Sequence, residues 1–225
     1  RIRQELRNAN IHAGPHRIAK LMRDNNIRAR RGPVKSRPRA APPHRRPEIG
    51  DRVEREFTRT APDQLWFADN TMIATQQGHL RATVVLDAFS RKVIGYSWAN
   101  QETLDTALNA LRGAITTRKP PPECVMHTDR GYHFTSNYWQ NILRDNNMLP
   151  SIGRLKSPLD NAVMESWFAS FKNEALYPYG RPATQAEAAL ILFRYIHFYN
   201  TRRLHSSLDY RTPVAFETAR NNLSV

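Results

Sequence analysis

The sequence predicts an α/β protein in which a mixed five-stranded sheet is flanked by helices. Three extended segments follow one another with short connections, which favours an antiparallel arrangement. Helical and extended segments then alternate, as in proteins whose helices cover a sheet. The 225 residues suffice for one sizeable domain with a small addition, and the single cysteine excludes an internal disulfide framework.

The N-terminal part has a different character from the rest. Residues 1–31 are expected to form a helical arm, because Ile18 and Met22 have helical spacing after the turn Gly14-Pro15. This arm resembles the end of a helix-turn-helix unit, and a simple helical extension is the alternative. Residues 32–50 alternate basic residues with proline, which predicts an extended linker that follows the phosphates of DNA, with a merely solvated tether as the alternative. The cations concerned are Arg37, Arg39, Arg45 and Arg46.

The compact domain is expected to begin near residue 51 with three antiparallel strands. Residues 65–69 combine large apolar side chains, and residues 80–87 and 93–98 are rich in β-branched and aliphatic ones. Gly78-His79 provides a turn between the first two strands, and residues 89–92 provide the second turn.

Helices and short strands alternate in the second half. Residues 103–117 place Leu104, Leu108 and Leu111 on one helical face, and the prolines at 120–122 end this helix. The later elements are expected as a strand at 124–128, a helix at 136–146, a strand at 149–152, and helices at 160–175, 184–200 and 213–221.

The charge balance points to a polyanionic partner. Lysine and arginine total 34 against 20 acidic residues, a net charge of +14, which favours binding to nucleic acid through counterion release. No run of 18 apolar residues exists, so no membrane span is expected. The start of the sequence lacks the apolar region of a signal peptide, and cysteine is scarce; both features fit a cytoplasmic setting.

Three acidic residues stand out by their contexts. Asp69 lies inside an apolar extended segment, and Asp129 follows another just before Gly131. A buried carboxylate without a partner is costly, and a divalent cation offsets that cost. Glu165 lies on a predicted helix, where Lys172, seven residues later, shares its face. If the three carboxylates converge, at least one pKa rises without metal, and the set suits two magnesium ions, with manganese as a substitute.

These acids fall within longer segments that resemble the successive signatures of DDE transposases. The similarity covers nearly the whole chain and is closest to the second-reading-frame transposases of bacterial copy-out-paste-in insertion sequences. The similar segments are 66–71, 85–91, 127–131, 160–166 and 199–208. Two departures matter: no His-His-Cys-Cys zinc module is present, which argues against a retroviral integrase, and Asn70 stands where isoleucine or valine is frequent.

The resemblance implies a fold, a reaction and a site. It implies a ribonuclease H-like core, similar to retroviral integrase, over residues 51–225, with Asp69, Asp129 and Glu165 as the metal-binding catalytic triad and two Mg²⁺ ions per site. Water would cleave a phosphodiester at a transposon end, and the exposed 3′-hydroxyl would then attack target DNA. The implied partners are transposon ends, target DNA and further copies of the chain, as a homodimer or higher oligomer associated with the nucleoid.

Basic residues near the acids are expected to contact this DNA. Lys172 shares the face of Glu165, whereas Arg154 and Lys156 lie in the loop before its helix. Two alternative functions stay open: a DNA-binding module of the same fold that has lost catalysis, and a nuclease of the ribonuclease H or resolvase type. An intact acidic triad counts against the first, and the basic linker and helical arm count against the second.

Other residues compete for places in the site. Asp87 is expected to be structural, paired with Arg91 or Lys92, with direct metal binding as the alternative. Glu174 is expected to make a surface pair, because it lies about 180° around the helix from Glu165.

The histidines and tryptophans receive structural assignments. His127 is expected to pack or hydrogen-bond beside a strand end, and His205 to cap or join helices. All four tryptophans are expected in the core rather than as platforms for base stacking: Trp66, Trp98, Trp139 and Trp167. If one of them stacks on a base, Trp167 is the candidate, because it lies close to Glu165.

Overall fold

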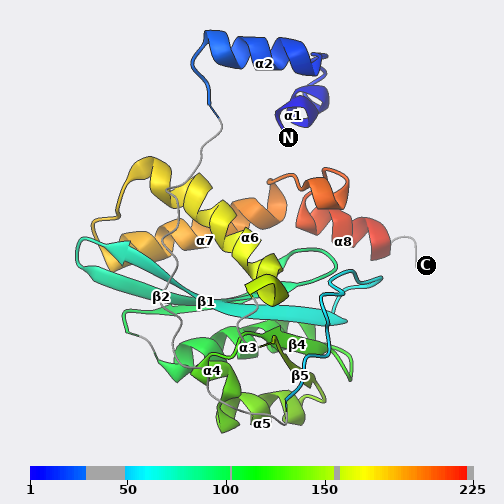
Figure 1. The fold of residues 1–225 in the computed structure, drawn as a ribbon, viewed down its shortest axis with the longest axis vertical. Coiled ribbons are helices and arrows are strands. Elements are labelled where there is room, and N and C mark those ends of the chain that lie inside the picture. The colour runs from blue at the N-terminus through cyan, green and yellow to red at the C-terminus, as the bar shows by residue number, and fades with distance from the viewer. Residues whose placement is uncertain (29–48, 102, 155–157, 222–225) are drawn as a thin grey trace.

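The structure is a computed structural model that describes residues 1–28, 49–101, 103–154 and 158–221 (Figure 1). Most of the expected basic linker lies outside the described residues, as does one loop before the helix of Glu165. Five of the expected DNA contacts are therefore not described: Arg37, Arg39, Arg45, Arg46 and Lys156.

A mixed five-stranded sheet forms the centre of the molecule, as the sequence predicts. Its order is β3-β2-β1-β4-β5; β1, β2 and β3 are antiparallel, whereas β4 is parallel to β1 and β5 is parallel to β4. The strands are β1 (Leu65–Thr75), β2 (Gly78–Asp87), β3 (Val93–Ala99), β4 (Val125–Thr128) and β5 (Leu149–Ile152).

The first strand is longer than expected. The polar residues after Asp69 suggest an end there, but β1 continues to Thr75 because its second half pairs with β2, with Asn70 opposite Thr83. The expected turn is also shifted, since Gly78 is already the first residue of β2. Gly78 has a φ of +124°, a backbone conformation that favours glycine. Asp69 therefore lies in the middle of a strand rather than at its end.

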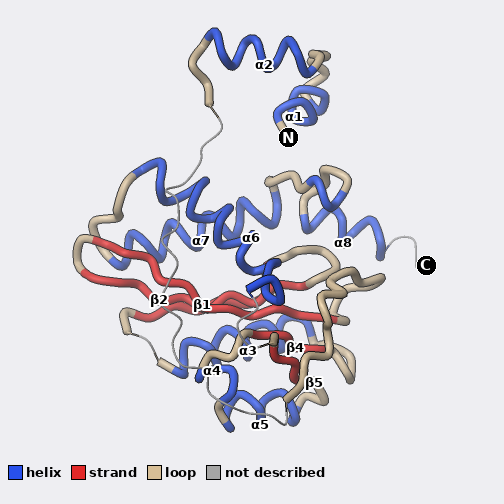
Figure 2. Tube along the Cα trace, viewed as in Figure 1, coloured by secondary structure: helices blue, strands red, loops and turns tan. Residues whose placement is uncertain are grey.

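Helices cover both faces of the sheet (Figure 2). On one face lie α3 (Leu104–Arg118), α4 (Tyr132–Thr135) and α5 (Asn137–Asp145), and on the other lie α6 (Ala162–Phe171), α7 (Gln185–Thr201) and α8 (Pro213–Asn221). The two interfaces form separate hydrophobic cores, which include Phe67 and Phe171 on the α6–α7 side and Trp66 and Leu111 on the α3 side. None of the helices in the described ranges is long and apolar enough to cross a membrane.

The helix that carries Glu165 is more irregular than the sequence suggests. A 3₁₀ turn, Pro158–Asn161, precedes α6, and a π-helix, Lys172–Leu176, follows it. The single continuous helix expected over 160–175 is therefore wrong at both ends, because hydrogen bonds of different spacing replace the α-helical ones. Lys172 lies at the point where the wider turn begins.

The N-terminal arm consists of α1 (Ile2–Asn8) and α2 (Pro15–Asp24), drawn in blue in Figure 1. Pro15 occupies the start of α2, as expected. No residue of either helix is buried. The arm meets the rest of the protein at Arg1, whose Nη1 lies 2.9 Å from Oε1 of Glu174.

The tryptophans confirm the expected core in three of four cases. Trp66, Trp139 and Trp167 are at most 2% exposed, so Trp167 belongs to the core and is not the exception that its position near Glu165 suggested. Trp98 is 37% exposed and stacks on Tyr96 with 5.9 Å between ring centroids, so its assignment to the core is wrong. Trp98 lies near the end of β3, an edge strand, where one side of the sheet has no neighbour.

Candidate active site

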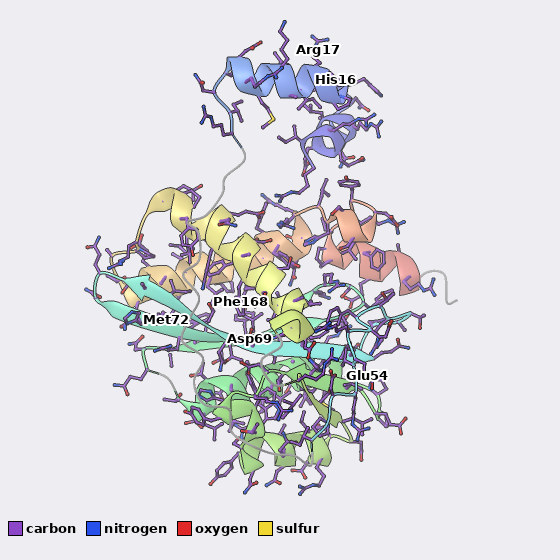
Figure 3. The ribbon with its side chains drawn as sticks, in the orientation of Figure 1. His16, Arg17, Glu54, Asp69, Met72 and Phe168 are labelled. Carbon is purple, nitrogen blue, oxygen red and sulfur yellow. The ribbon has the colours of Figure 1, made fainter. Side chains whose placement is uncertain are left out.

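Strand register brings Asp69 and Asp129 together. Asp69 lies on β1, close to α6 (Figure 3), and Asp129 directly follows β4. In this parallel pair Ala68 lies opposite Thr128, so Asp69 and Asp129 are the next residues of two neighbouring chains. Adjacent strands are about 4.8 Å apart. Two carboxylates that are 60 positions apart in sequence therefore lie side by side.

The surroundings of Asp69 disfavour its negative charge. Burial raises its pKa well above the ordinary value, and the negative charge of Asp129 is the next cause. A hydrogen bond from the backbone N–H of Asn70, 2.7 Å from Oδ1, opposes the shift. Glu165 raises the pKa of Asp69 further and Lys172 lowers it, so both side chains are within electrostatic reach. The expected rise of one pKa is confirmed at Asp69.

Asp129 is held by the turn that follows it. Its pKa is raised because the surrounding protein desolvates the carboxyl group, although the residue is exposed. The backbone N–H of Gly131, 2.8 Å from Oδ1, and the nearby His133 oppose that shift. A Cβ atom at Gly131 would lie 2.9 Å from this Oδ1. Glycine at this position therefore leaves the space that the carboxylate occupies.

Glu165 lies in the first turn of α6 and is exposed. The start of this helix is tied to β1 by Asn161, which precedes it: Nδ2 of Asn161 donates to Oδ2 of Asp69 over 3.0 Å. Asn161 is only 8% exposed, and its Oδ1 is buried without a hydrogen bond among the described residues. Asn161 was not expected in the site from the sequence, although an amide directly before the helix of Glu165 is the signal that could have identified it.

A buried ionic network supports the loop before α6. Asp160 is 2% exposed; Nε of Arg55 and the backbone N–H of Arg154 each donate to it over 2.8 Å. Nε2 of His127 lies 3.1 Å from the Asp160 carbonyl oxygen, and Nδ1 lies 2.9 Å from Oγ of Ser151. The structural assignment of His127 is thus confirmed. Arg154, an expected DNA contact, binds Asp160 through Nε over 3.2 Å while its side chain stays 54% exposed.

A second polar link joins β1 to the α3 side of the sheet. Nδ2 of Asn70 lies 3.3 Å from Nδ1 of His133, and Oγ1 of Thr83 donates to Oδ1 of Asn70 over 2.6 Å. Asn70 thus connects the strand of Asp69 to α4, the short helix after Asp129. His133 went unnoticed in the sequence because α4 was not expected.

The rival acids have structural partners. Asp87 is fully buried and accepts hydrogen bonds from the backbone N–H groups of Ser90 and Asp63, over 2.8 and 2.9 Å. The expectation that Asp87 is structural is confirmed, but the expected ion pair with Arg91 or Lys92 is wrong, because backbone groups of the turn reach it first.

Glu174 lies in a half-buried cluster rather than in a surface pair. It accepts hydrogen bonds from Nη2 and Nε of Arg203, each over 2.9 Å, and from the hydroxyl of Tyr195 over 3.1 Å. It therefore takes no part in the site of Asp69. His205 is buried against Tyr199, and its backbone bridges to Arg211, so it joins the segments after α7 as expected.

The donor set suits a divalent cation. Asp69, Asp129 and Glu165 offer carboxylate oxygens, which magnesium and manganese prefer. Asp69 is disfavoured as an anion by burial and by Asp129, and a bound cation would remove both penalties. Among the described residues, no three His, Cys, Asp or Glu side chains are close enough together to form a ready-made metal cluster. The residues fit a cation, and the third carboxylate is less tightly associated than the first two.

Sequence comparisons connect this geometry to known proteins. The integrase core domain family matches residues 59–158, and a second integrase core domain family matches residues 146–213. The transposase for insertion sequence element IS904 of Lactococcus lactis is 34% identical over 220 residues, which cover 96% of this chain and 85% of that protein. Transposase InsF for insertion sequence IS3A of Escherichia coli is 32% identical over 218 residues, covering 96% and 75%.

Structural comparison shows the same fold in viral proteins. The catalytic core domain of HTLV-2 integrase, solved in complex with magnesium, has a TM-score of 0.54 at 20% identity and covers 70% of this chain and 97% of its own. A chain in the structure of the simian T-cell lymphotropic virus intasome in complex with PP2A regulatory subunit B56 gamma has a TM-score of 0.60 at 19% identity, and the match covers 85% of this chain and 62% of that one. The expected ribonuclease H-like fold, similar to retroviral integrase, is confirmed.

Proposed function

Because this chain belongs to the insertion-sequence transposases with an integrase core domain, we propose that Asp69, Asp129 and Glu165 are its catalytic residues. Its function is DNA transposition and integration, which makes it a polynucleotidyl transferase. The observation that carries the proposal is the side-by-side placement of Asp69 and Asp129 on β1 and after β4, with Glu165 within electrostatic reach.

We propose that these carboxylates hold Mg²⁺, with Mn²⁺ as a substitute and two ions in the loaded site. Bound there, such ions would activate the attacking oxygen and stabilise the leaving oxygen. Hydrogen bonds from Asn70 and Asn161 orient the Asp69 carboxylate, and each of its oxygens keeps a lone pair for a cation. The magnesium in the solved HTLV-2 integrase core supports this choice of ion.

The proposed reaction has two chemically similar steps. Water first attacks a phosphodiester at a transposon end, which breaks the bond to the 3′ oxygen and leaves a 3′-hydroxyl. That hydroxyl then attacks a phosphodiester of target DNA, and the displaced strand leaves through its own 3′ oxygen. No covalent bond to the protein forms in either step, so the protein needs only to position the reacting groups, and the cations that the carboxylates would hold would offset the negative charge of the phosphate.

The DNA-contacting residues and the assembly are part of the same proposal. Arg154 lies before α6 and Lys172 directly after it, and we propose that both bind the DNA backbone, together with Lys156, the helical arm and the basic linker arginines. Two DNA ends must be joined in one reaction, which requires a homodimer or larger complex on DNA in the bacterial cytoplasm. The dimeric and trimeric HTLV-2 cores and the viral intasome support such an assembly.

The test compares Glu165→Gln with Asp145→Asn. Both variants remove one negative charge from an exposed side chain, but Asp145 lies at the end of α5, in the layer on the other face of the sheet. Glu165→Gln should bind duplex DNA as the wild type does and yield no 3′-end cleavage or strand transfer in Mg²⁺, whereas Asp145→Asn should retain both. Wild-type activity in Glu165→Gln would refute the assignment.

The same assays separate the alternative functions. A catalytically inactive DNA-binding module would bind DNA and give no product with any divalent cation. A ribonuclease H-type nuclease would cleave an RNA–DNA hybrid and would not join DNA strands. The proposed transposase should join DNA strands and leave the hybrid uncut.

A further inference from the structure

A polar cavity lies beside the helix of Glu165. Its volume is about 410 Å³, and Ala162, Ser166 and Ser170 of α6 form one wall. Tyr199 at the end of α7 and the segment 203–207 form another wall, and Arg91 reaches the cavity from the turn between β2 and β3. None of the described residues that line it is acidic. Ala162 and Ser166 flank Glu165 on the helix, so the cavity opens next to the candidate active site.

The charge of Arg91 is not neutralised in this cavity. Arg91 is half-buried, and no hydrogen bond or ion pair reaches its side chain from any residue in the described ranges. Burial lowers its pKa, and this effect outweighs the opposing electrostatic influence of Tyr199 and Asp87. An arginine kept half-buried in this way costs free energy unless a ligand compensates for it.

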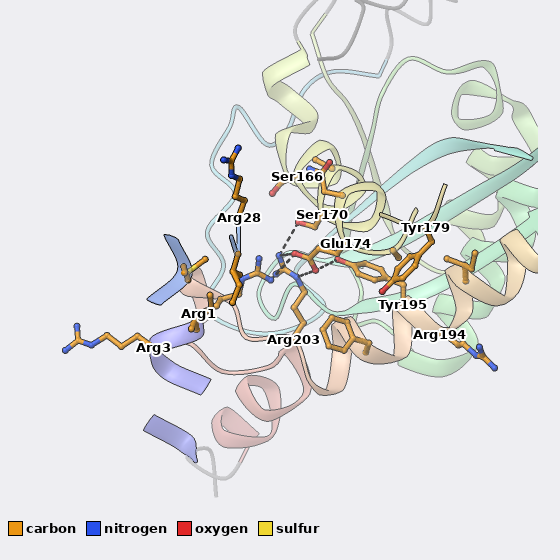
Figure 4. Close-up of a pocket in the computed structure, with 18 of the residues that line it drawn as sticks. Arg1, Arg3, Arg28, Ser166, Ser170, Glu174, Tyr179, Arg194, Tyr195 and Arg203 are labelled. Atoms are coloured by element: carbon orange, nitrogen blue, oxygen red, sulfur yellow. Dashed lines mark hydrogen bonds and ion pairs between the residues drawn. The ribbon is translucent and has the colours of Figure 1, made fainter. Parts of the chain in front are cut away.

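The second arginine of the core in the cavity is already paired. Arg203 binds Glu174 through Nε and Nη2, each over 2.9 Å, and Nη2 lies 3.3 Å from Oγ of Ser170 (Figure 4). Glu174 also takes the ion pair from Arg1. Glu174 is therefore occupied, and among the described arginines that line the cavity Arg91 is the one without an ion pair.

The neutral groups of the cavity add hydrogen-bond donors. Trp167 lines the cavity, and its Nε1–H is buried without a partner among the described residues. An indole nitrogen can only donate. The hydroxyl groups of Ser166, Ser206 and Ser207 are also on the wall. A site with an arginine, an indole N–H, several hydroxyls and no carboxylate matches a ligand that is anionic and rich in acceptors.

The charged side chains among the described residues of the cavity wall are all cations: Arg1, Arg91 and Arg203. His205 also lines the cavity, and the pKa of His205 is lowered to about 4, first by burial and then by the charges of Arg203, Arg1 and Arg91. His205 is therefore neutral near pH 7 and adds no further charge. Phosphate is the anion that best combines charge with several acceptor oxygens, and arginine is well suited to bind it.

We propose that this cavity binds a backbone phosphate of the DNA strand that crosses the start of α6, with Arg91 as its principal cation. The inference rests on the proposed function, because it places this phosphate beside the one that reacts at Glu165. It assigns Arg91 and the segment 203–207 to DNA binding, whereas Asp69, Asp129 and Glu165 perform the chemistry.

The test measures binding of a fluorescent duplex oligonucleotide to the full chain, without divalent cation, over a range of KCl concentrations. Arg91→Gln removes the charge, Arg91→Lys keeps it, and Arg112→Gln is the matched control, an exposed arginine of α3 in the layer on the other face of the sheet. Lysine and glutamine are equally strained at this position, where φ is +60°, so they differ mainly in charge.

Arg91→Gln should bind roughly tenfold more weakly at low salt, and its log–log salt slope should be smaller by about 0.9, the value for one phosphate. Arg91→Lys should recover most of the slope, and Arg112→Gln should match the wild type. If Arg91→Gln and Arg112→Gln behave alike while the wild type shows a steep salt dependence, the cavity does not bind DNA. If the wild type itself shows no salt-dependent binding, the proposed function fails instead.

A second experiment distinguishes DNA from free phosphate as the ligand of the cavity. Inorganic phosphate is titrated into the ¹⁵N-labelled protein while the indole N–H resonances are followed. Little change at millimolar phosphate is expected, since one isolated phosphate lacks the contacts of the neighbouring nucleotides. Saturable shifts that disappear in Arg91→Gln, without an effect of that variant on DNA binding, would identify a free anion as the ligand and overturn the proposal.

Discussion

Asp63 and Glu217 share one guanidinium group, whereas Asp69 and Asp129 lie side by side with no ion pair to either among the described residues. Nη2 of Arg118 lies 2.7 Å from both Oδ2 of Asp63 and Oε1 of Glu217, and Nζ of Lys92 lies 2.7 Å from Oε2 of Glu217.

The two groups of acids differ in whether the fold supplies them with a cation, and this difference separates structural acids from acids that can bind a metal. Where acids stabilise the fold, cations from distant parts of the sequence meet them, and the pKa of Glu217 is lowered: its burial acts upward, but Arg118 and Lys92 outweigh it. At Asp69 the pKa is raised instead, by burial and by Asp129. The electrostatic effect of Lys172 does not outweigh this rise, so the carboxylate pair is suited to take a cation from solution.

The largest effect on stability is expected from removing the charge of Glu217, which pairs with Arg118 and Lys92. Glu217→Gln leaves the mostly buried Arg118 with one partner fewer and should lower the free energy of unfolding by about 2 kcal/mol. Because the pKa of Glu217 is lowered on folding, its contribution is present above the unfolded pKa and is lost as the pH falls through the folded pKa. Denaturant unfolding at neutral and acid pH measures both effects.

The control for this prediction is Glu123→Gln, an exposed glutamate. It should change stability by less than about 0.5 kcal/mol. A difference between Glu217→Gln and wild type that stays constant down to acid pH would contradict the ionic account of the cluster.

The next largest effect is expected from removing the hydrogen bond that orients the Asp69 carboxylate. Asn161→Ala removes the donor to Oδ2 and should reduce strand transfer roughly tenfold, as loss of a supporting partner of a metal ligand typically does. Asn146→Ala is the matched control. Asn146 is also an amide at the end of a helix, and its Nδ2 donates to a backbone carbonyl of α5. Equal activity of the two variants, at equal stability, would remove Asn161 from the site.

The smallest effect is expected from adding a cation to the free protein. Mn²⁺ at several times its Kd should stabilise the wild type by roughly 1 kcal/mol, because it binds only the folded state. Asp69→Asn should lose this gain, while Glu217→Gln should keep it despite its lower starting Tm. Calorimetry across a Mn²⁺ series measures the shift, and an equal gain in Asp69→Asn would place the cation elsewhere.

Local patterns in the sequence were sufficient for most elements but not for the site's supporting contacts. The antiparallel strands and the helix of Leu104 follow from periodicity, which depends on neighbouring residues alone. The end of β1 was misjudged because pairing with β2 overrides the polar character of Asn70. The short helix α4 has only four residues, too few for a periodic signal.

The contacts of the site residues with residues far away in the sequence could not be predicted, for a different reason. The candidate acids are recognisable from their sequence contexts, but the bond from Asn161 to Asp69 joins residues 92 positions apart. The expected pairing of Asp87 with Arg91 relied on proximity in sequence, whereas the folded chain offers backbone N–H groups to Asp87 and pairs Lys92 with Glu217. Only the packed structure shows which cation meets which acid.

The most direct test of the central claim is a crystal of the protein with Mn²⁺, in which anomalous scattering locates the metal. The account predicts manganese between Asp69 and Asp129, with Glu165 as the third ligand. An ordered site that stays empty at high Mn²⁺ both in the free protein and in its complex with DNA would contradict it.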